Sequence, residues 1–82
     1  MKNKFILESL ASDLKRVALG LHRGSNKMAE RFLDESLKRK AELDMNEIAP
    51  YLRKFITKID NKIEAEDALM LSTLIQNYSQ RL

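Results

Sequence analysis

The sequence contains no cysteine and only one histidine, His22. Without cysteine the chain has no disulfide bond, thiolate metal site or thiolate nucleophile, and it is compatible with a reducing cytoplasm, where we expect the protein to reside. With one histidine, a zinc ion would need mostly carboxylate ligands, which are uncommon in structural sites. We therefore expect no catalytic residue, no metal site and no cofactor.

Long apolar runs are also missing. The longest stretch without a charged residue is Ala68 to Gln80, and it contains serine, threonine, glutamine and asparagine. A membrane-spanning helix needs about 18 or more mostly apolar residues, so the sequence predicts no membrane span. Glu8 and Asp13 interrupt the apolar core that a signal peptide would need after the basic start of the chain.

Residues that break helices or favour strands are scarce. The chain has two glycines, one proline and one valine, whereas leucine occurs 13 times. Hydrophobic residues make up 44% and charged residues 33% of the chain, which is too apolar for a disordered protein. The sequence therefore predicts an all-α fold, with residues 1–82 forming a single domain that is a small antiparallel bundle of three to four helices.

Apolar residues that recur at steps of three and four predict the first two helices, at about residues 3–21 and 27–43. The apolar stripe of the first helix consists of Leu7, Leu10, Leu14, Val17 and Leu21. Between the helices, Gly24 suits the left-handed residue that follows a helix, and Ser25 or Asn26 suits the cap of the next one. A loop this short predicts that the two helices are antiparallel.

The second half of the chain predicts helices at about residues 50–63 and 66–82. The apolar stripe that ends at Ile63 and the stripe that includes Leu71 and Ile75 differ by a rotation of roughly 120°, which predicts a turn near 63–66. The alternative is one continuous helix of about 30 residues, which is unusually long for a small domain. Asp44 and Pro50 are both typical of helix starts, and the sequence leaves open at which of them the chain bends.

Basic residues are concentrated in the N-terminal half. The first 40 residues contain ten Lys and Arg against five Asp and Glu, and the remaining 42 contain five against seven, which gives the net charge of +3. This half includes a loop of residues 22–27 at a helix N-terminus, where unpaired N–H groups favour anions, and a basic stripe along the second helix. The candidate residues for anion or nucleic-acid binding are His22, Arg23, Ser25, Lys27, Arg31, Lys38 and Arg39.

The simpler interpretation of these basic residues is a helix cap followed by a solvated helix face. Asp34 and Glu35 dilute the stripe and are spaced to pair with Lys38 and Arg39. A second cluster, Asp60, Glu64 and Asp67, would share one face of a continuous helix and could then bind a divalent cation. Acidic residues at a helix start explain that cluster better, because they interact favourably with the helix dipole.

Apolar residues remain after each helix has been given one inward stripe. The candidate interaction surface consists of Phe5, Ile6, Leu69, Met70 and Leu74. Because the last helix is apolar on most sides, and such helices are usually enclosed by protein, a second copy of the chain is the simplest partner. The alternative is that this helix occupies the centre of a monomeric bundle. The sequence favours a non-enzymatic helical protein-interaction or oligomerisation module, a homodimer. The alternative is weak binding of nucleic acid or a phosphate ligand through the basic N-terminal half.

Overall fold

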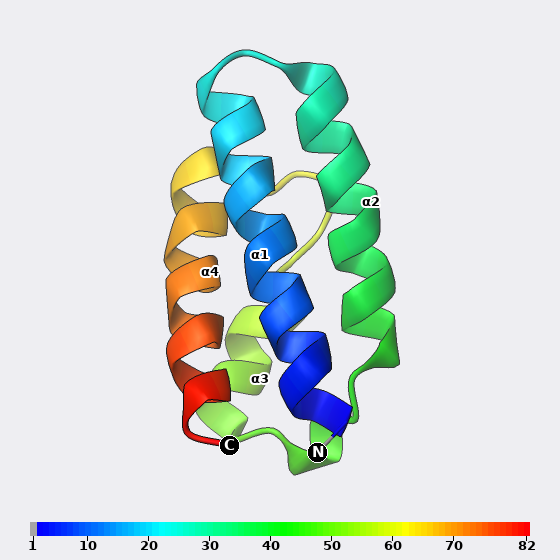
Figure 1. The fold of residues 1–82 in the computed structure, drawn as a ribbon, viewed down its shortest axis with the longest axis vertical. Helices are drawn as coiled ribbons and strands as arrows, with labels where there is room; N and C mark the ends of the chain where they lie inside the picture. Colours follow the sequence, from blue (N-terminus) through cyan, green and yellow to red (C-terminus); the bar gives the residue numbers. More distant parts are fainter. Residues whose placement is uncertain (1) are drawn as a thin grey trace.

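The computed structural model describes residues 2–82 and contains an all-α bundle (Figure 1). Three long helices lie side by side: α1 (Lys2–His22), α2 (Asn26–Glu42) and α4 (Ala65–Gln80). Helix α1 is the central one, because it packs against both α2 and α4 and is antiparallel to each. A short helix, α3 (Pro50–Thr57), covers the back of one end of the bundle. The predicted fold class is confirmed.

The loop between α1 and α2 has the predicted chemistry. Gly24 adopts a φ of +73°, the left-handed conformation that favours glycine. The Ser25 N–H donates to the Gly20 carbonyl at 2.8 Å, and the Met28 N–H donates to the Ser25 hydroxyl at 3.4 Å. Ser25 is therefore the cap of α2, and the turn returns the chain antiparallel to α1.

Small residues allow the central helix to approach its neighbours closely. Gly20 of α1 faces Ala29 of α2, and a Cβ added at Gly20 would lie 2.8 Å from the Ala29 nitrogen. Ala11 and Ala18 of α1 are buried too. These positions explain why α1 can occupy the centre of the bundle.

The main core lies between α1, α3 and α4. Leu7, Leu10 and Leu14 of α1 are fully buried and belong to the same cluster as Leu52 of α3 and Ile75 of α4. Burying one such aliphatic side chain contributes about 1.5–3 kcal/mol. The stripes predicted for α1 and for the centre of α4 are confirmed as core.

The chain bends at both candidate positions between α2 and α3. Asp44 caps a short 3₁₀ helix, η1 (Met45–Glu47), by accepting a hydrogen bond from the Asn46 N–H. Pro50 then occupies the first turn of α3. The side-chain amide of Asn3 exchanges two hydrogen bonds with the Asp44 backbone, at 2.9 and 3.0 Å, and so ties this connection to α1.

The helix predicted over 50–63 is wrong in its length, because α3 ends at Thr57. The Lys40 ammonium donates to the carbonyls of Thr57 and Ile59, at 3.2 and 2.8 Å, and satisfies groups that would otherwise continue the helix. Ile59 keeps its predicted burial without being helical. Beyond it, the Asp60 carboxylate accepts a hydrogen bond from the Lys62 N–H in a local turn.

The predicted turn before the last helix is confirmed, and the continuous helix is excluded. Helix α4 begins at Ala65, with Glu66 and Asp67 in its first turn, where acidic residues are favoured. At the other end α4 stops at Gln80 rather than at the predicted residue 82, so Leu82 lies outside the helix and is 38% exposed. Across residues 2–82, none of the helices is both long and apolar enough to cross a membrane.

Candidate functional site

Large apolar side chains remain exposed on the surface. They are Phe5, Leu19, Tyr51, Leu69, Met70 and Leu82. Of the predicted interaction surface, Phe5, Leu69 and Met70 are exposed, and Phe5 is the most exposed at 68%. The prediction is wrong for Ile6, which is only 8% exposed and belongs to the main core, and for Leu74, which packs partly buried against that core. Both side chains are covered because α3 and the connections add a layer that helix periodicity alone does not reveal.

The outer side of α1 is a regular stripe that the sequence analysis missed. Its members are exposed and alternate at steps of three and four residues: Phe5, Glu8, Ser12, Lys15 and Leu19. We call this set the outer α1 stripe. Its period equals that of the buried stripe, because both follow the helical repeat on opposite sides of α1. The signal was therefore present in the sequence, and only the position of α4 shows that this side has no cover.

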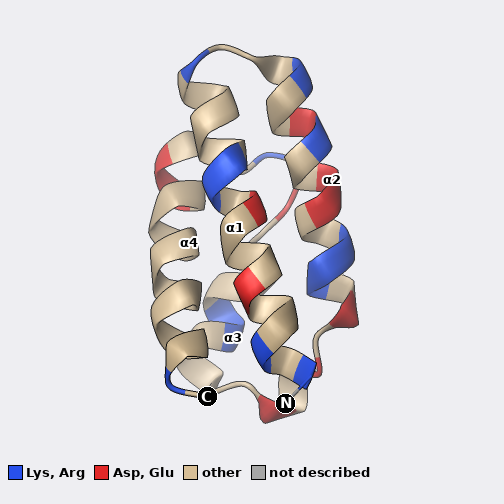
Figure 2. Ribbon diagram, viewed as in Figure 1, with Lys and Arg blue, Asp and Glu red and all other residues tan. Residues whose placement is uncertain are grey.

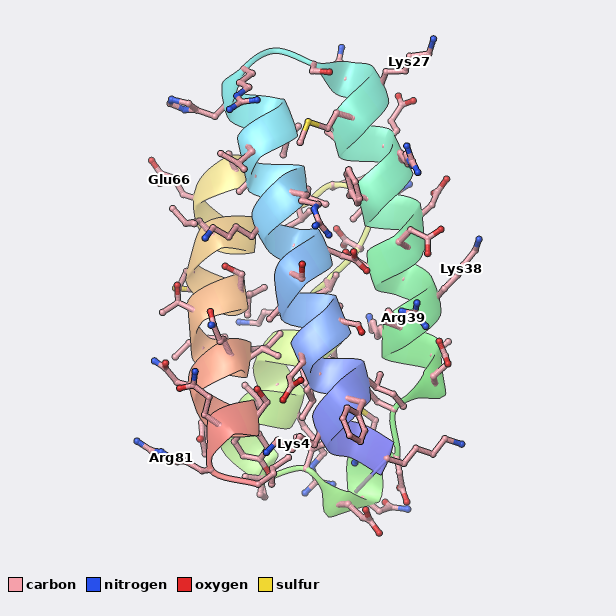
Figure 3. All side chains as sticks on the ribbon, in the orientation of Figure 1. Lys4, Lys27, Lys38, Arg39, Glu66 and Arg81 are labelled. Carbon is pink, nitrogen blue, oxygen red and sulfur yellow. The ribbon has the colours of Figure 1, made fainter. Side chains whose placement is uncertain are left out.

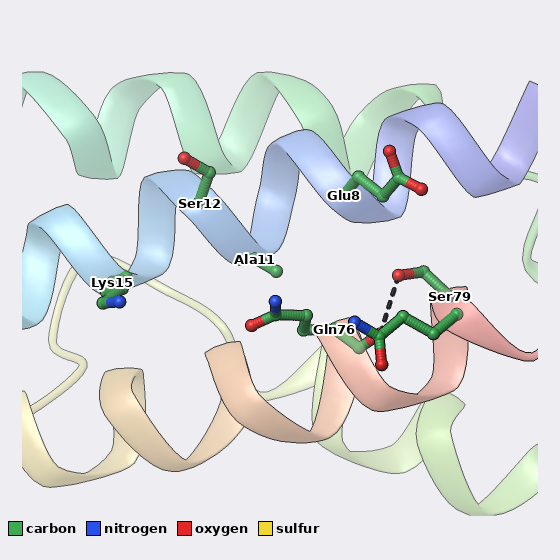
Figure 4. Close-up of a pocket in the computed structure, with 7 residues that line it drawn as sticks. Glu8, Ala11, Ser12, Lys15, Gln76 and Ser79 are labelled. Atoms are coloured by element: carbon green, nitrogen blue, oxygen red, sulfur yellow. Dashed lines mark hydrogen bonds between the residues drawn. The ribbon is translucent and has the colours of Figure 1, made fainter.

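A groove runs between α1 and α4 beside the outer α1 stripe (Figure 4). Its polar part has a volume of about 370 Å³ and is bordered by Glu8, Ser12 and Lys15 of α1 and by Gln76 of α4. The next part along the seam is a hollow of about 260 Å³ lined mainly by apolar side chains. Leu19 and Leu69 border this apolar hollow from the two helices.

Leu69 and Met70 do not form one surface, although they are adjacent in sequence. Leu69 faces the seam with α1, whereas Met70 lines a separate hollow of about 360 Å³ with Phe55 and Ile63, on the α3 side of α4. This separation follows from the helical repeat, which rotates neighbouring residues by about 100°. Of the apolar residues predicted to interact, Leu69 therefore borders the α1/α4 seam, while Phe5 is exposed on the outer side of α1 and lines neither part of the groove.

Helix α4 has a long uncharged surface. Between Asp67 and Arg81 it contains no Lys, Arg, Asp or Glu, and its ribbon is uniformly uncharged there (Figure 2). Depletion of charged residues distinguishes the centre of protein interfaces from ordinary surface. The seam between α1 and α4 thus combines an uncharged helix with a stripe whose only charges are Glu8 and Lys15.

The loop predicted to bind anions does not converge on a site. The Ser25 hydroxyl is used as the cap of α2, and the Ser25 N–H is used by Gly20. His22 lies against the apolar hollow beside α4, whereas Lys27 belongs to α2 and points outward from it (Figure 3). Arg23 is exposed. These groups surround no common point.

The basic stripe on α2 is largely engaged within its own helix. Lys38 lies 3.7 Å from Glu35, and Arg39 lies 3.2 Å from Glu42. In both pairs the partners are three residues apart, whereas the predicted pairs were four residues apart. The Arg31 guanidinium lies 5.5 Å from the centre of the Phe32 ring. Exposed ion pairs contribute little stability, but they lower the positive potential that a phosphate backbone would meet.

A charged cluster of Asp13 and Arg16 from α1 and Glu35 and Arg39 from α2 lies between these two helices. Burial raises the pKa of the Asp13 carboxyl above the ordinary aspartate value, and the nearby Glu35 charge raises this pKa further. The positive charges of Arg39 and Arg16 lower the same pKa but do not cancel the effect of burial. The Arg16 guanidinium lies 3.9 Å from the Asp13 carboxylate and also stacks over Phe32 at 5.2 Å. The Asp13 side chain is only 13% exposed, so this cluster is part of the helix packing rather than an open site.

Metal binding has no support from the arrangement of the acidic residues. The cluster of Asp60, Glu64 and Asp67 required a continuous helix, and Asp60 instead lies in the turn before α4. Within residues 2–82, no three His, Cys, Asp or Glu side chains lie where they could hold a metal ion together. The exposed α1/α4 side is therefore the candidate functional surface.

Comparisons with protein-family models, with curated proteins and with solved structures found no match for this chain.

Proposed function

We propose that this protein is a non-enzymatic helical module that associates with a second copy of itself through the outer α1 stripe and the adjoining edge of α4. The observation that supports this function best is the exposure of Phe5 and Leu19, at 68% and 39%, on one side of the central helix. Helix α1 is covered by protein on its other sides, so this is the side on which a further element would complete the bundle.

Binding of nucleic acid is the less favoured function. The basic side chains that would contact phosphates lie on α2, where acidic residues are interspersed and where Lys38 and Arg39 pair with Glu35 and Glu42. On the α1/α4 side, Leu19 and Leu69 are exposed and α4 is uncharged between Asp67 and Arg81, although α1 has charged residues along its visible side (Figure 2). We propose the cytoplasm as the location of the protein, on the sequence argument that its fold uses no disulfide bond.

The dependence of molecular mass on concentration tests the proposed function. We expect sedimentation equilibrium to show a reversible monomer–dimer equilibrium with a dissociation constant of about 1–100 µM, typical of a small interface. Phe5→Ser should weaken the dimer about tenfold or more, because it removes a large exposed aromatic contact.

Met70→Ser is the matched control for Phe5→Ser. Met70 is similarly apolar and is 46% exposed, but it lies on the α3 side of α4. Its replacement should leave the dissociation constant unchanged. A chain that stays monomeric up to about 1 mM would contradict self-association, and an equal effect of the two substitutions would contradict the choice of surface.

A further inference from the structure

The outer α1 stripe is symmetric about Ser12. Phe5 and Leu19 lie seven residues to either side of Ser12, and Glu8 and Lys15 lie on either side of it as well. At a rise of 1.5 Å per residue, the midpoints of these two pairs differ by only about 0.75 Å along the helix axis. The apolar pair forms the ends of the stripe, and the oppositely charged pair lies inside it. Rotating α1 end over end about Ser12 therefore brings Phe5 to the position of Leu19 and Glu8 to the position of Lys15.

Resting on the proposed self-association, we propose that two copies pair face to face with their α1 helices antiparallel, about a two-fold axis that passes near Ser12. In this arrangement Phe5 of each copy meets Leu19 of the other, and Glu8 of each copy meets Lys15 of the other. Each contact occurs twice, as a two-fold interface requires.

The charges favour a second copy in this direction over any parallel arrangement. Glu8 and Lys15 are both exposed and have no ion-pair partner among residues 2–82. In antiparallel copies the two charges meet their opposites, whereas parallel copies would place Glu8 against Glu8 and Lys15 against Lys15. Like charges that face each other across an interface repel, so they disfavour the parallel pairing.

The apolar ends are compatible in size. The hollow beside Leu19, between α1 and α4, has a volume of about 260 Å³ and a mainly apolar lining that includes Leu69 and Ala18. An apolar cavity of about 150 Å³ holds a benzene molecule, so this hollow has room beside Leu19 for the exposed phenyl ring of Phe5. Each copy thus has one exposed ring, at Phe5, and one hollow, at Leu19, at equal distances from Ser12 along α1.

Helix α4 fits the same symmetry. Because α4 lies in one layer with α1, the rotation brings the two α4 helices together over their uncharged surfaces. It also moves Glu66 to the end of the face at which Lys4 and Arg81 of the other copy lie (Figure 3). One long face of a molecule of 35 × 19 × 19 Å covers roughly 650 Å² in projection and includes α2, so an interface limited to α1 and α4 buries less than this per partner, as in weak, transient association.

Charge reversal at Glu8 and Lys15 tests the antiparallel register. Glu8→Lys and Lys15→Glu each place like charges opposite one another twice per dimer, and each should weaken the dimer about tenfold or more at ~50 mM salt. The double variant Glu8→Lys/Lys15→Glu restores both attractive pairs and should return the dissociation constant to within about threefold of the parent. Because both side chains are exposed, all three variants should remain helical by circular dichroism.

The outcomes separate the register from self-association itself. If the parent dimerises, the single variants weaken the dimer and the double variant restores it, the antiparallel pairing is supported. If the parent dimerises but the double variant stays as weak as the single ones, the antiparallel register is overturned while the proposed function stands. If the parent is monomeric throughout, both are overturned.

Discussion

Gly20 sets the distance between α1 and α2. A Cβ at this position would lie 2.8 Å from the Ala29 nitrogen and 3.1 Å from its Cα, and backbone atoms cannot move aside as a flexible side chain can. Gly20→Ala should therefore push the helices apart and lower the free energy of unfolding by about 1–2 kcal/mol, despite the better helix propensity of alanine. Urea unfolding of the variant beside the parent measures this loss. A variant as stable as the parent would show that the close approach is not needed.

Asp13 gives the protein a specific dependence on pH. Because burial raises the pKa of this carboxyl in the folded state, the folded protein holds the Asp13 proton at pH values where the unfolded chain has lost it. The contribution of Asp13 to stability therefore falls as the pH rises from its unfolded pKa through its folded pKa. At pH 7 the charged group disfavours folding relative to a neutral one.

Asp13→Asn removes this penalty. We expect the variant to have a higher midpoint of thermal unfolding than the parent at pH 7, and the difference to shrink as the pH is lowered and to vanish near pH 3, where both side chains are neutral. Thermal unfolding followed at several pH values provides the measurement. A variant that is less stable than the parent at pH 7 would show that the attraction of Arg39 and Arg16 for the carboxylate outweighs its burial.

At the scale of elements, helix α4 depends on Leu71 and Ile75. These side chains are 3% and 0% exposed and pack in the main core. Truncating a buried leucine or isoleucine to alanine costs about 2–5 kcal/mol, and a domain of this size has only about 4–12 kcal/mol in total. Leu71→Ala combined with Ile75→Ala should therefore largely unfold the protein in urea titrations.

Lys38→Ala is the control for this double substitution. Lys38 lies on the polar side of α2, where its ion pair with Glu35 is exposed, so its loss should change stability by less than about 0.5 kcal/mol. If the double variant unfolds at the same urea concentration as the parent, α4 is not part of the core as described.

The long helices could be predicted from sequence because local signals agree with the tertiary packing. Gly24 and Ser25 end one helix and start the next through their own conformations and hydrogen bonds. The end of α3 at Thr57 could not be predicted in this way. The carbonyl of its last residue accepts a hydrogen bond from Lys40, 17 residues earlier in the chain, and no local pattern contains such a contact. The three- and four-residue spacing of apolar residues continues through Ile59. A residue buried in a turn, as Ile59 is, produces the same sequence pattern as one buried on a helix.

At the scale of the whole molecule, the candidate surface depends on which sides of α1 are covered. Phe5 and Leu69 could be predicted from the sequence as surplus apolar residues, but so could Ile6, which is buried in the main core with residues of α3 and the connection before it. Leu19 was not part of the predicted surface, and its neighbour across the seam, Leu69, lies 50 residues away in the chain. Only the arrangement of α1 beside α4 places these two side chains at one hollow.

The proposed interface between copies is the α1/α4 side of the molecule, not the basic side of α2. A dilution series of amide ¹⁵N–¹H spectra from about 1 mM to about 10 µM tests this residue by residue. If copies associate through this side, the amide signals of Phe5, Ser12 and Leu19 move together with concentration, while those of Lys27 and Lys38 stay fixed. Signals that do not move anywhere, or that move on α2 instead, would contradict it.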